Sequence, residues 1–351
     1  MTKRATSPSI KLIAAKALVS IGTVDRVLHN RKGVSEKTRV KIQRIVSALG
    51  YTPNIYARNL SLAKTYHFGV LMPKLAQDSG YWQIPVEGMK KAARELAAYK
   101  VNVSFFHFDR YSEASFKSAF QRANGDHLDG LLIAPVLSHA AEKLLPAIPH
   151  RTPYVFFDSN IPGANSLSFI GQDPFQSGLL AAGLMLRMMK TGGRVAIVKV
   201  TPEDFHINER IRGFQAGMQS TNDIRTLLYE VDSQQGNAGF DRVTAKILGE
   251  NRDLVGMFVS NAWTHPFAHH ISSSGRRKKI FIVGYDLVEK NIELLKQGCI
   301  DFLISQRPEM QGYEGIYSLY RHGVLREKVT KKIMVPIDIL TKENIGYYQV
   351  M

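Results

Sequence analysis

The sequence is poor in cysteine and has no long apolar run. Its single cysteine, Cys299, excludes a disulfide within the chain. A lone thiol favours a reducing compartment, so we expect a cytoplasmic protein. No apolar run approaches the about 20 residues that a membrane-spanning helix requires, so no membrane partner is expected. The start of the chain resembles a signal peptide only superficially, because Lys11 and Lys16 interrupt its apolar stretch.

Signatures of cofactor binding and of covalent catalysis are also missing. No GxGxxG motif opens a helix after a predicted strand, and no GxxxxGK[ST] motif occurs. There is no Ser-His-Asp order, nucleophile elbow or metal-ligand cluster. We therefore expect no cofactor, no metal site and no enzymatic activity. The alternative is an enzyme on the same scaffold, which turnover of a bound sugar would support. The three histidines His265, His269 and His270 are interpreted as helix-surface residues, with metal binding as the alternative.

Positive charge is concentrated near the N-terminus. The 351 residues include 46 Lys and Arg against 30 Asp and Glu, a net charge of +16. Residues 1–65 alone hold 13 of the basic and 2 of the acidic residues. A basic surplus confined to one small unit indicates a polyanion partner. Regular apolar spacing distinguishes this unit from a low-complexity basic tail.

Three short helices are predicted in this basic unit. Residues 10–17 have apolar side chains at helical spacing. Ser20 can cap a second helix, and Ser35 a third that stops at Gly50. This arrangement predicts a helix-turn-helix fold over residues 1–51, whose second helix enters the major groove of DNA. Ile21, Gly22 and Arg26 are expected on the outward face of that helix, where Arg26 could pair with guanine or simply with phosphate. The residues expected near phosphates are Ser20, Thr23, His29, Asn30 and Arg39.

Three sub-motifs of this unit resemble the headpiece of the lactose-repressor/galactose-repressor (LacI/GalR) family. They are VSIGTVDRVLHN at 19–30, VSEKTR at 34–39, and LGYTPN at 49–54 followed by ARNL at 57–60. Leu18 stands where the family generally has Gly, and Asp25 where it generally has Ser. The resemblance implies that residues 52–65 form a hinge helix on operator DNA. Asn54 and Ala57 would contact DNA there, and Leu60 would be wedged into the minor groove; the alternative is a flexible linker whose Leu60 packs on the core.

The remainder, residues 66–351, alternates apolar strands with helical stretches. Nine strands are predicted, beginning with HFGVLMP at 67–73 and ending with IDFLISQ at 300–306. Such alternation indicates parallel sheets covered by helices. The predicted fold class is α/β: an all-α headpiece followed by a two-lobed, periplasmic-binding-protein-like core of doubly wound parallel sheets. We expect an N-lobe over about 66–165 and 307–332 and a C-lobe over about 166–306 and 333–351.

Polar and aromatic residues gather at the carboxyl ends of the predicted strands, where open α/β sheets bind ligands. The candidates are Trp82, Asp109, Asp158, Asn261, Trp263, Asp286 and Gln306. The core is similar to the type I periplasmic sugar-binding proteins and to the repressor core. That resemblance implies sugar contacts for Trp82, Arg210 in RIRGF, Asn261, Asp286 in GYD, and Gln306. Ala262 departs from the pattern, which usually has Asp at that position.

These features together predict a DNA-binding transcriptional regulator, most simply a repressor. We expect a homodimer on a near-palindromic operator, because two-fold protein symmetry calls for symmetric half-sites. A small carbohydrate between the lobes would control operator affinity. One alternative is a purine or sugar-phosphate effector, which Lys74, Lys199 and Arg307 could serve. The other is a sugar receptor that does not bind DNA.

Overall fold

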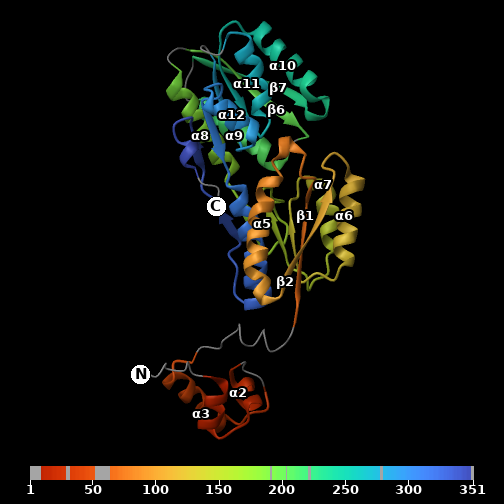
Figure 1. Ribbon diagram of the computed structural model, residues 1–351, viewed down its shortest axis with the longest axis vertical. Helices are drawn as coiled ribbons and strands as arrows, with labels where there is room; N and C mark the ends of the chain where they lie inside the picture. Colours follow the sequence, from red (N-terminus) through yellow and green to blue (C-terminus); the bar gives the residue numbers. More distant parts are fainter. Residues whose placement is uncertain are drawn as a thin grey trace. The chain divides into compact units, whose positions relative to one another are not determined.

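The structure is a computed structural model that describes residues 9–28, 32–51, 64–189, 192–202, 204–219, 223–276 and 280–348. The chain divides into an N-terminal unit that ends at Lys64 and a core that begins at Thr65. Figure 1 draws both units with their helices and strands labelled. Each unit is described by itself below.

The N-terminal unit is a three-helix fold that confirms the predicted helix-turn-helix. Its helices are α1 (Ile10–Ala17), α2 (Ile21–Leu28) and α3 (Glu36–Ala48). The Ser20 Oγ accepts from the Thr23 amide at 3.1 Å, and the Ser35 Oγ accepts from the Thr38 amide at 3.3 Å, so hydroxyls cap both α2 and α3 as predicted. The helices bury one small apolar core, formed by Ile13, Ala14, Ala17, Val24, Val27 and Ile42.

The turn between α1 and α2 places a leucine in a conformation that favours glycine. Leu18 has φ 56° and ψ 47°, the left-handed region, and its side chain is 85% exposed. Its amide donates to the Ala15 carbonyl at 3.2 Å, which closes the end of α1. A side chain with a Cβ is strained there by about 1 kcal/mol, and exposure means that no packing offsets the strain.

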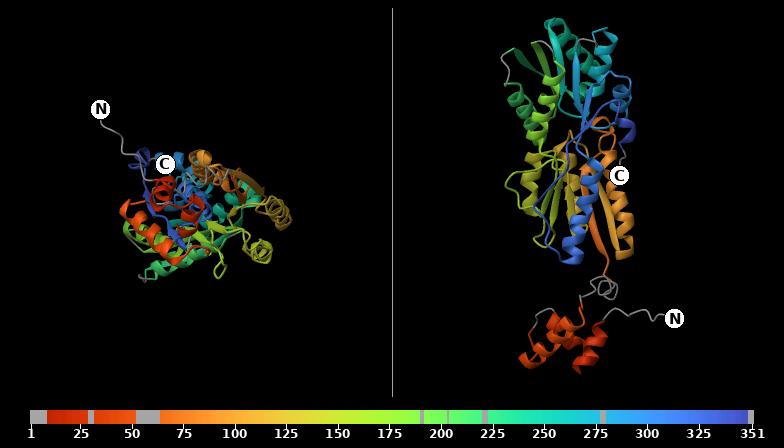
Figure 2. Two further views of the ribbon diagram at one scale, coloured as in Figure 1. Left: turned by 90° about the horizontal axis from the view of Figure 1, so that it is seen from below. Right: turned by 90° about the vertical axis from the view of Figure 1, so that its left-hand side faces the viewer.

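The N-lobe is a six-stranded sheet with strand order β11-β5-β4-β3-β1-β2, and every pairing is parallel. Helices α5 and α13 pack together on one face, while α6 and α7 lie on the other (Figures 1 and 2). The strands are β1 (Tyr66–Pro73), β2 (Val101–Phe108), β3 (Gly130–Ile133), β4 (Tyr154–Phe157), β5 (Ser168–Gly171) and β11 (Lys332–Met334). The helices are α5 (Gln83–Leu96), α6 (Glu113–Gly125), α7 (Ser138–Leu144) and α13 (Pro308–Tyr320).

The C-lobe repeats this topology with strand order β12-β10-β9-β8-β6-β7, except that β12 runs antiparallel to β10. Alternate residues of β6 enter the apolar clusters on opposite faces of the sheet. The strands are β6 (Gly193–Thr201), β7 (Ile224–Asp232), β8 (Leu254–Val259), β9 (Phe281–Tyr285), β10 (Phe302–Ser305) and β12 (Asp338–Leu340). The helices are α8 (Pro174–Met188), α9 (Phe205–Met218), α10 (Gly236–Glu250), α11 (Thr264–Ser273) and α12 (Glu289–Lys296).

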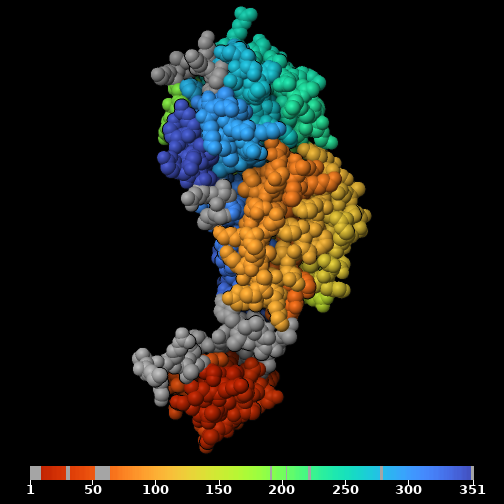
Figure 3. Space-filling view, in the orientation of Figure 1, coloured from red at the N-terminus to blue at the C-terminus, as the bar shows by residue number. Residues whose placement is uncertain are grey.

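The chain crosses between the lobes at three points, and these correct the predicted boundaries. β5 pairs with β4, so residues 168–171 belong to the N-lobe and not to the C-lobe that was expected to begin at 166. β11 likewise keeps residues 332–334 in the N-lobe, because it pairs with β5. The crossings follow β5, β10 and β11. On the face drawn in Figure 3, orange N-lobe atoms and light-blue C-lobe atoms touch directly.

Glycines bring one pair of helices into backbone contact in each lobe. A Cβ added to Gly88 of α5 would lie 1.9 Å from the Glu309 carbonyl oxygen at the start of α13, too close for any other residue. In the C-lobe, a Cβ on Gly213 of α9 would lie 2.1 Å from the Phe175 carbonyl oxygen in α8. These close contacts fix the N-terminal turns of α8 and α13, which follow the lobe crossings after β5 and β10.

None of the helices in the described ranges is both long and apolar enough to cross a membrane.

We predict that Leu18→Gly stabilises the N-terminal unit by roughly 0.5–1 kcal/mol. Glycine removes the left-handed strain, although its greater freedom in the unfolded chain offsets part of the gain. Hydrogen exchange of the α1 and α2 amides in the full chain measures the change. Leu12→Gly is the control, since Leu12 is also an exposed leucine but lies inside α1. That variant should speed exchange, and a slowing of exchange in both, or in neither, contradicts the strain argument.

Candidate functional site

Two aspartates occupy equivalent positions in the two lobes. Asp158 follows β4 and Asp286 follows β9, and both have left-handed backbones, with φ 66° and 67°. Each amide donates to the next strand: Asp158 to the Ile170 carbonyl at 3.1 Å, and Asp286 to the Ile304 carbonyl at 3.0 Å. This shared turn directs the chain away from the sheet at its carboxyl edge. Both carboxyl groups are buried and line one cavity between the lobes.

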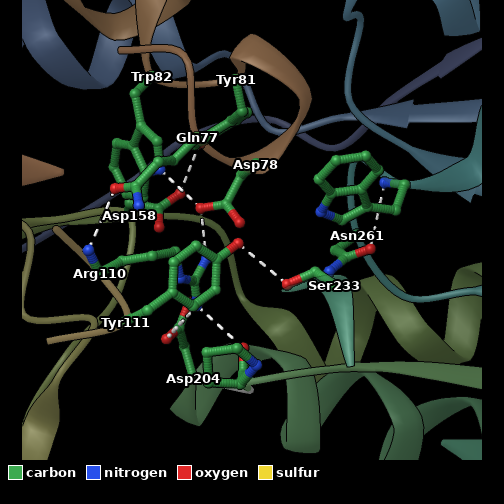
Figure 4. A network of polar contacts seen from close by, with 12 residues as sticks. Gln77, Asp78, Tyr81, Trp82, Arg110, Tyr111, Asp158, Asp204, Ser233 and Asn261 are labelled. Carbon is green, nitrogen blue, oxygen red and sulfur yellow. Dashed lines mark hydrogen bonds and ion pairs between the residues drawn. The ribbon is translucent and has the colours of Figure 1, made fainter. Parts of the chain in front are cut away.

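A buried arginine links the lobes. Arg110 comes from the loop after β2, and its guanidinium forms an ion pair with Asp78 of the N-lobe. Its Nη2 also donates to the Asp204 carboxylate of the C-lobe at 3.1 Å and to the Pro202 carbonyl at 2.9 Å. Figure 4 shows Arg110 among these residues. The cation thus joins carboxylates from both lobes, and they raise its pKa against the effect of burial.

Two further contacts join residues of the N-lobe to residues of the C-lobe. The Tyr111 hydroxyl lies 2.9 Å from the Ser233 Oγ, which follows β7 (Figure 4). The Ser79 Oγ lies 2.8 Å from His265 Nε2, at the start of α11. Burial lowers the pKa of His265 to about 4, so its imidazole is neutral near pH 7.

A second network runs beneath the cavity from the C-lobe to the crossings. Arg210 Nη2 donates to Gln306 Oε1 at 2.8 Å, and Gln306 Nε2 donates to Asp286 Oδ1 at 3.0 Å. Gln311 at the start of α13 donates to the Gln306 carbonyl at 2.7 Å and accepts from the Asp158 amide at 2.8 Å. The two equivalent aspartates are therefore connected through two glutamines.

The N-lobe wall of the cavity is aromatic. The Tyr81 hydroxyl donates to Asp158 Oδ1 at 2.5 Å, and the Trp82 indole donates to Asp78 Oδ2 at 2.7 Å. Their rings meet edge to face, with centroids 5.1 Å apart. Each ring is thus anchored at its polar end by a cleft carboxylate.

The cavity between the lobes measures about 20 Å³. That is close to the space that one water molecule occupies, so the lobes are nearly closed on each other. The residues that line it are Asp78, Tyr81, Trp82, Arg110, Asp158, Pro202, Asp204, His206, Ile207, Asn261, Ala262, Asp286 and Gln306.

The cleft has more acidic than basic groups, and burial changes how they titrate. Burial raises the pKa of Asp286 to about 7, although Arg210 opposes the change. Burial also raises the pKa of Asp204 to about 7, against the effect of Arg110. The pKa of Asp158 is raised by burial as well, and the Tyr81 hydrogen bond opposes the rise. Because each carboxyl group is desolvated, an anionic ligand would meet a site that already resists negative charge.

Five of the eight predicted ligand residues line the cavity: Trp82, Asp158, Asn261, Asp286 and Gln306. Arg210 is buried beneath them and holds Gln306, with its guanidinium carbon 4.1 Å from the centroid of the Tyr285 ring. Trp263 is outside the lining and packs on Phe240, with ring centroids 5.0 Å apart. The Asn261 Oδ1 accepts from the Trp263 amide at 3.2 Å.

Asp109 does not line the cavity. Its carboxylate turns back along the N-lobe and accepts from Lys74 at 2.9 Å, from Gln77 at 2.8 Å and from the Tyr111 amide at 3.0 Å. These bonds close the turn after β2, and the next residue, Arg110, enters the cleft instead. Arg110, and not Asp109, therefore brings this strand end to the cavity.

The sequence reasoning missed several cleft residues, among them Arg110, Asp78, Asp204 and His206. Arg110 comes two residues after the end of a predicted strand, and this place in the sequence could have identified it as a cleft residue. Asp204 and His206 lie just before Arg210 in EDFHINER, a polar stretch whose place beside the cleft depends on how α9 meets the other lobe. Neither spacing nor composition indicates that contact.

The predicted DNA-contacting residues are only partly described. Ile21 is 46% exposed, and Gly22 and Arg26 are exposed on the same helix. Ser20 and Thr23 form the cap of α2. The Arg39 guanidinium lies 3.8 Å from Glu36, with its side chain 16% exposed. His29, Asn30, Asn54, Ala57 and Leu60 lie outside the described residues, as do residues 52–63 of the hinge predicted over 52–65.

The three cations considered for an anionic effector are engaged in ion pairs outside the cavity. Lys74 pairs with Asp109, Lys199 lies 3.4 Å from Glu230, and Arg307 pairs with Asp338 at 2.6 Å. Of the three histidines interpreted as helix-surface residues, His270 contacts Asp241 at 2.9 Å. His265 is buried, so the interpretation is wrong for that residue. In the part of the chain that the structure describes, no group of His, Cys, Asp and Glu is arranged to hold a metal ion.

Two family models match the chain. The periplasmic binding protein domain matches residues 68–325, and the bacterial regulatory proteins of the lacI family match residues 9–54. A two-lobed ligand-binding core with a helix-turn-helix unit before it is the class that the fold and the cleft define. The chain belongs to the LacI family of bacterial regulatory proteins, with a periplasmic-binding-protein domain as its core.

Individual relatives agree with this assignment. Catabolite control protein A of Streptococcus mutans is 25% identical over 208 residues, which is 59% of this chain and 59% of that protein. The sucrose operon repressor of Lactococcus lactis is 24% identical over 279 residues, 79% of this chain and 82% of the repressor. A structure from Bacteroides fragilis, described as a LacI transcriptional regulator, superposes with a TM-score of 0.75 at 27% identity. It covers 82% of this chain and 100% of its own.

We predict that Asp286→Asn raises the unfolding midpoint by about 5 °C at pH 8 and by much less at pH 5. The folded pKa of about 7 lies above the unfolded value, so the carboxyl group stabilises the fold at low pH and loses that contribution as the pH rises toward 7. Asparagine stays neutral and tolerates the left-handed backbone.

Thermal unfolding from pH 5 to pH 8 measures this difference. Glu142→Gln, an exposed carboxylate of α7, is the control and should leave the pH dependence unchanged. A midpoint difference for Asp286→Asn that stays constant with pH would falsify the assigned cause.

Proposed function

We propose that the protein is a sequence-specific DNA-binding transcriptional regulator, acting as a repressor, whose operator affinity is controlled by a small neutral carbohydrate between the core lobes. The observation that carries the proposal is the pairing of two units in one chain. One is a basic helix-turn-helix with Arg26 exposed on a capped second helix. The other is a cleft whose two equivalent aspartates are joined by glutamines.

The cleft chemistry supports a neutral polyhydroxylated ligand. Buried carboxylate and amide oxygens accept hydrogen bonds from hydroxyl groups, and Tyr81 and Trp82 provide flat apolar faces. Four aspartates line the cavity with one arginine. This excess of acid, with Lys74, Lys199 and Arg307 paired elsewhere, disfavours a sugar phosphate or a purine nucleotide.

DNA binding and effector binding would be coupled through the lobes. A ligand that binds one lobe arrangement more tightly shifts the population toward it, and operator affinity changes by the same coupling free energy. We further propose a homodimer, because one headpiece contacts too few base pairs for specificity. A cytoplasmic regulator without catalytic activity fits the single cysteine and the relatives, which are transcriptional regulators.

We predict that Arg26→Ala lowers affinity for an operator selected from a random duplex library by about 10- to 100-fold, and affinity for unselected DNA much less. The reason is that Arg26 is exposed on the helix that would read the major groove. Fluorescence anisotropy at fixed salt measures both affinities.

Lys41→Ala provides the comparison, because Lys41 is an exposed cation of α3. It should weaken both kinds of binding by a similar small factor, as expected for a phosphate contact. Equal losses on selected and unselected DNA for Arg26→Ala would show that Arg26 does not read bases. Leu60→Ala, by the same assay, should also affect specific binding more than non-specific binding.

We predict that neutral pentoses or hexoses, and not sugar phosphates or sugar acids, raise the unfolding midpoint of the full chain by mass action on the native state. Asp158→Asn should abolish the shift, because it removes a cleft carboxylate. Asp109→Asn is the matched control, since Asp109 also follows a strand but faces away from the cavity. Stabilisation by phosphates alone would refute a neutral effector.

A further inference from the structure

A larger pocket adjoins the central cavity beside the points where the chain crosses between the lobes, and we call it the hinge-side pocket. It measures about 560 Å³, within the range of small-molecule sites, and shares Asp158 and His206 with the central cavity. The structure therefore offers far more room beside the cleft than inside it. The pocket is lined by Asp158, Asn160, Ile161, Pro162, Gly163, Ala164, Ser166, Phe169, Gln172, Asp173, Pro174, Phe175, Phe205, His206, Glu209, Lys331, Lys332 and Met334.

Both lobes contribute walls to this hinge-side pocket. The loop between β4 and β5, together with β5 and β11, forms the N-lobe wall. The first turns of α8 and α9 form the C-lobe wall. A molecule in the pocket would contact both lobes at once, so its contacts would depend on how far the lobes are closed.

The pocket presents aromatic rings beside polar side chains. Phe169 is buried in the N-lobe wall, while Phe175 and Phe205 come from the first turns of α8 and α9. Phe205 remains 38% exposed and Met334 47% exposed. Large apolar side chains exposed beside buried polar groups are typical of a ligand site.

Two buried polar atoms in the pocket lining have no hydrogen-bond partner among the described residues: His206 Nδ1 and Gln172 Oε1. Gln172 Nε2 donates to the Ser305 carbonyl at 3.0 Å and to the Pro336 carbonyl at 3.2 Å, so the opposite end of its amide is left as an acceptor. His206 is 7% exposed, and burial holds its pKa well below the ordinary value. An unpaired buried acceptor costs free energy that a ligand hydroxyl can recover.

We propose that the hinge-side pocket is a second ligand subsite that takes the second ring of a glycoside. The inference rests on the proposed function and names its ligand more narrowly: a disaccharide, which the site would bind more tightly than a free monosaccharide. Phenylalanine rings would pack on the C–H face of the second sugar. Gln172 Oε1 and His206 Nδ1 would bond its hydroxyls, and Asp158 would stand where the two rings join.

The test compares disaccharides with the methyl glycosides of their first sugar by isothermal titration calorimetry on the full chain. The pairs are maltose with methyl α-D-glucopyranoside, cellobiose with methyl β-D-glucopyranoside, and lactose with methyl β-D-galactopyranoside. We expect one disaccharide to bind at least about tenfold more tightly than its methyl glycoside. Phe205→Ala should reduce that advantage to less than about threefold and leave methyl glycoside affinity unchanged.

A second variant and a control separate a subsite from a folding defect. Ala164→Trp should fill the pocket and remove the disaccharide advantage by a different route. Leu228→Ala, which truncates a 48% exposed side chain on β7 outside the pocket, should change neither affinity.

The outcomes distinguish the subsite from the proposed function. Equal affinity for both members of every pair, or equal loss of both in Phe205→Ala, overturns the subsite and leaves the sugar-controlled regulator intact. Binding of no sugar in either class overturns the carbohydrate effector as well. DNA binding by the selected-duplex assay is scored independently of all three results.

Discussion

The closed arrangement of the core depends on one buried cation. Arg110 leaves β2 of the N-lobe and is held by Asp78 of its own lobe and by Asp204 of the other. All three side chains are at least nine-tenths buried. A buried charge is tolerated only when its partners are in place, and removing one partner leaves an uncompensated charge that costs several kcal/mol. When the lobes separate, Asp204 must leave Arg110 and both must be hydrated. The ion triad therefore favours two distinct lobe arrangements over a continuum, which is the property that a ligand-controlled switch requires.

The repeated topology explains why the cleft contains matched groups. Both sheets have the same strand order, so the turn after β4 in one lobe is equivalent to the turn after β9 in the other. Asp158 and Asp286 occupy these turns with nearly identical φ angles. The glycine contacts between α5 and α13 and between α8 and α9 repeat as well, through Gly88 and Gly213. Close helix packing fixes the first turn of α13, which supplies Gln311 to the network between the two aspartates. The site is thus a consequence of two copies of one topology that face each other.

The sequence predicted those parts of the structure that depend on local pattern. Buried parallel strands are continuous apolar runs, so nine of the twelve described strands were recognisable, and Asp158 and Asp286 followed from their ends. Strand β7, IRTLLYEVD, was missed because it is an edge strand whose apolar run is interrupted by charged residues. Strands β11 and β12 have three residues each, too few for any period to show. Arg110 and Asp204 were missed for a different reason, since they meet only because the two lobes close on each other.

Effector control requires contacts that differ between the two lobe arrangements. A ligand held by one lobe alone would bind both arrangements equally and shift nothing, however tight its binding. Asp158 belongs to the N-lobe and Asp286 to the C-lobe, so a sugar that bonds both is held fully only when the lobes are close. A second ring between Phe169 of β5 and Phe205 of α9 would add a further contact of this kind. This contact would lie close to the lobe crossings. A small change in the angle between the lobes moves the pocket walls less there than it moves the walls of the central cavity. The central carboxylates would then supply most of the discrimination between open and closed lobes, and the hinge-side pocket most of the selectivity for ligand size.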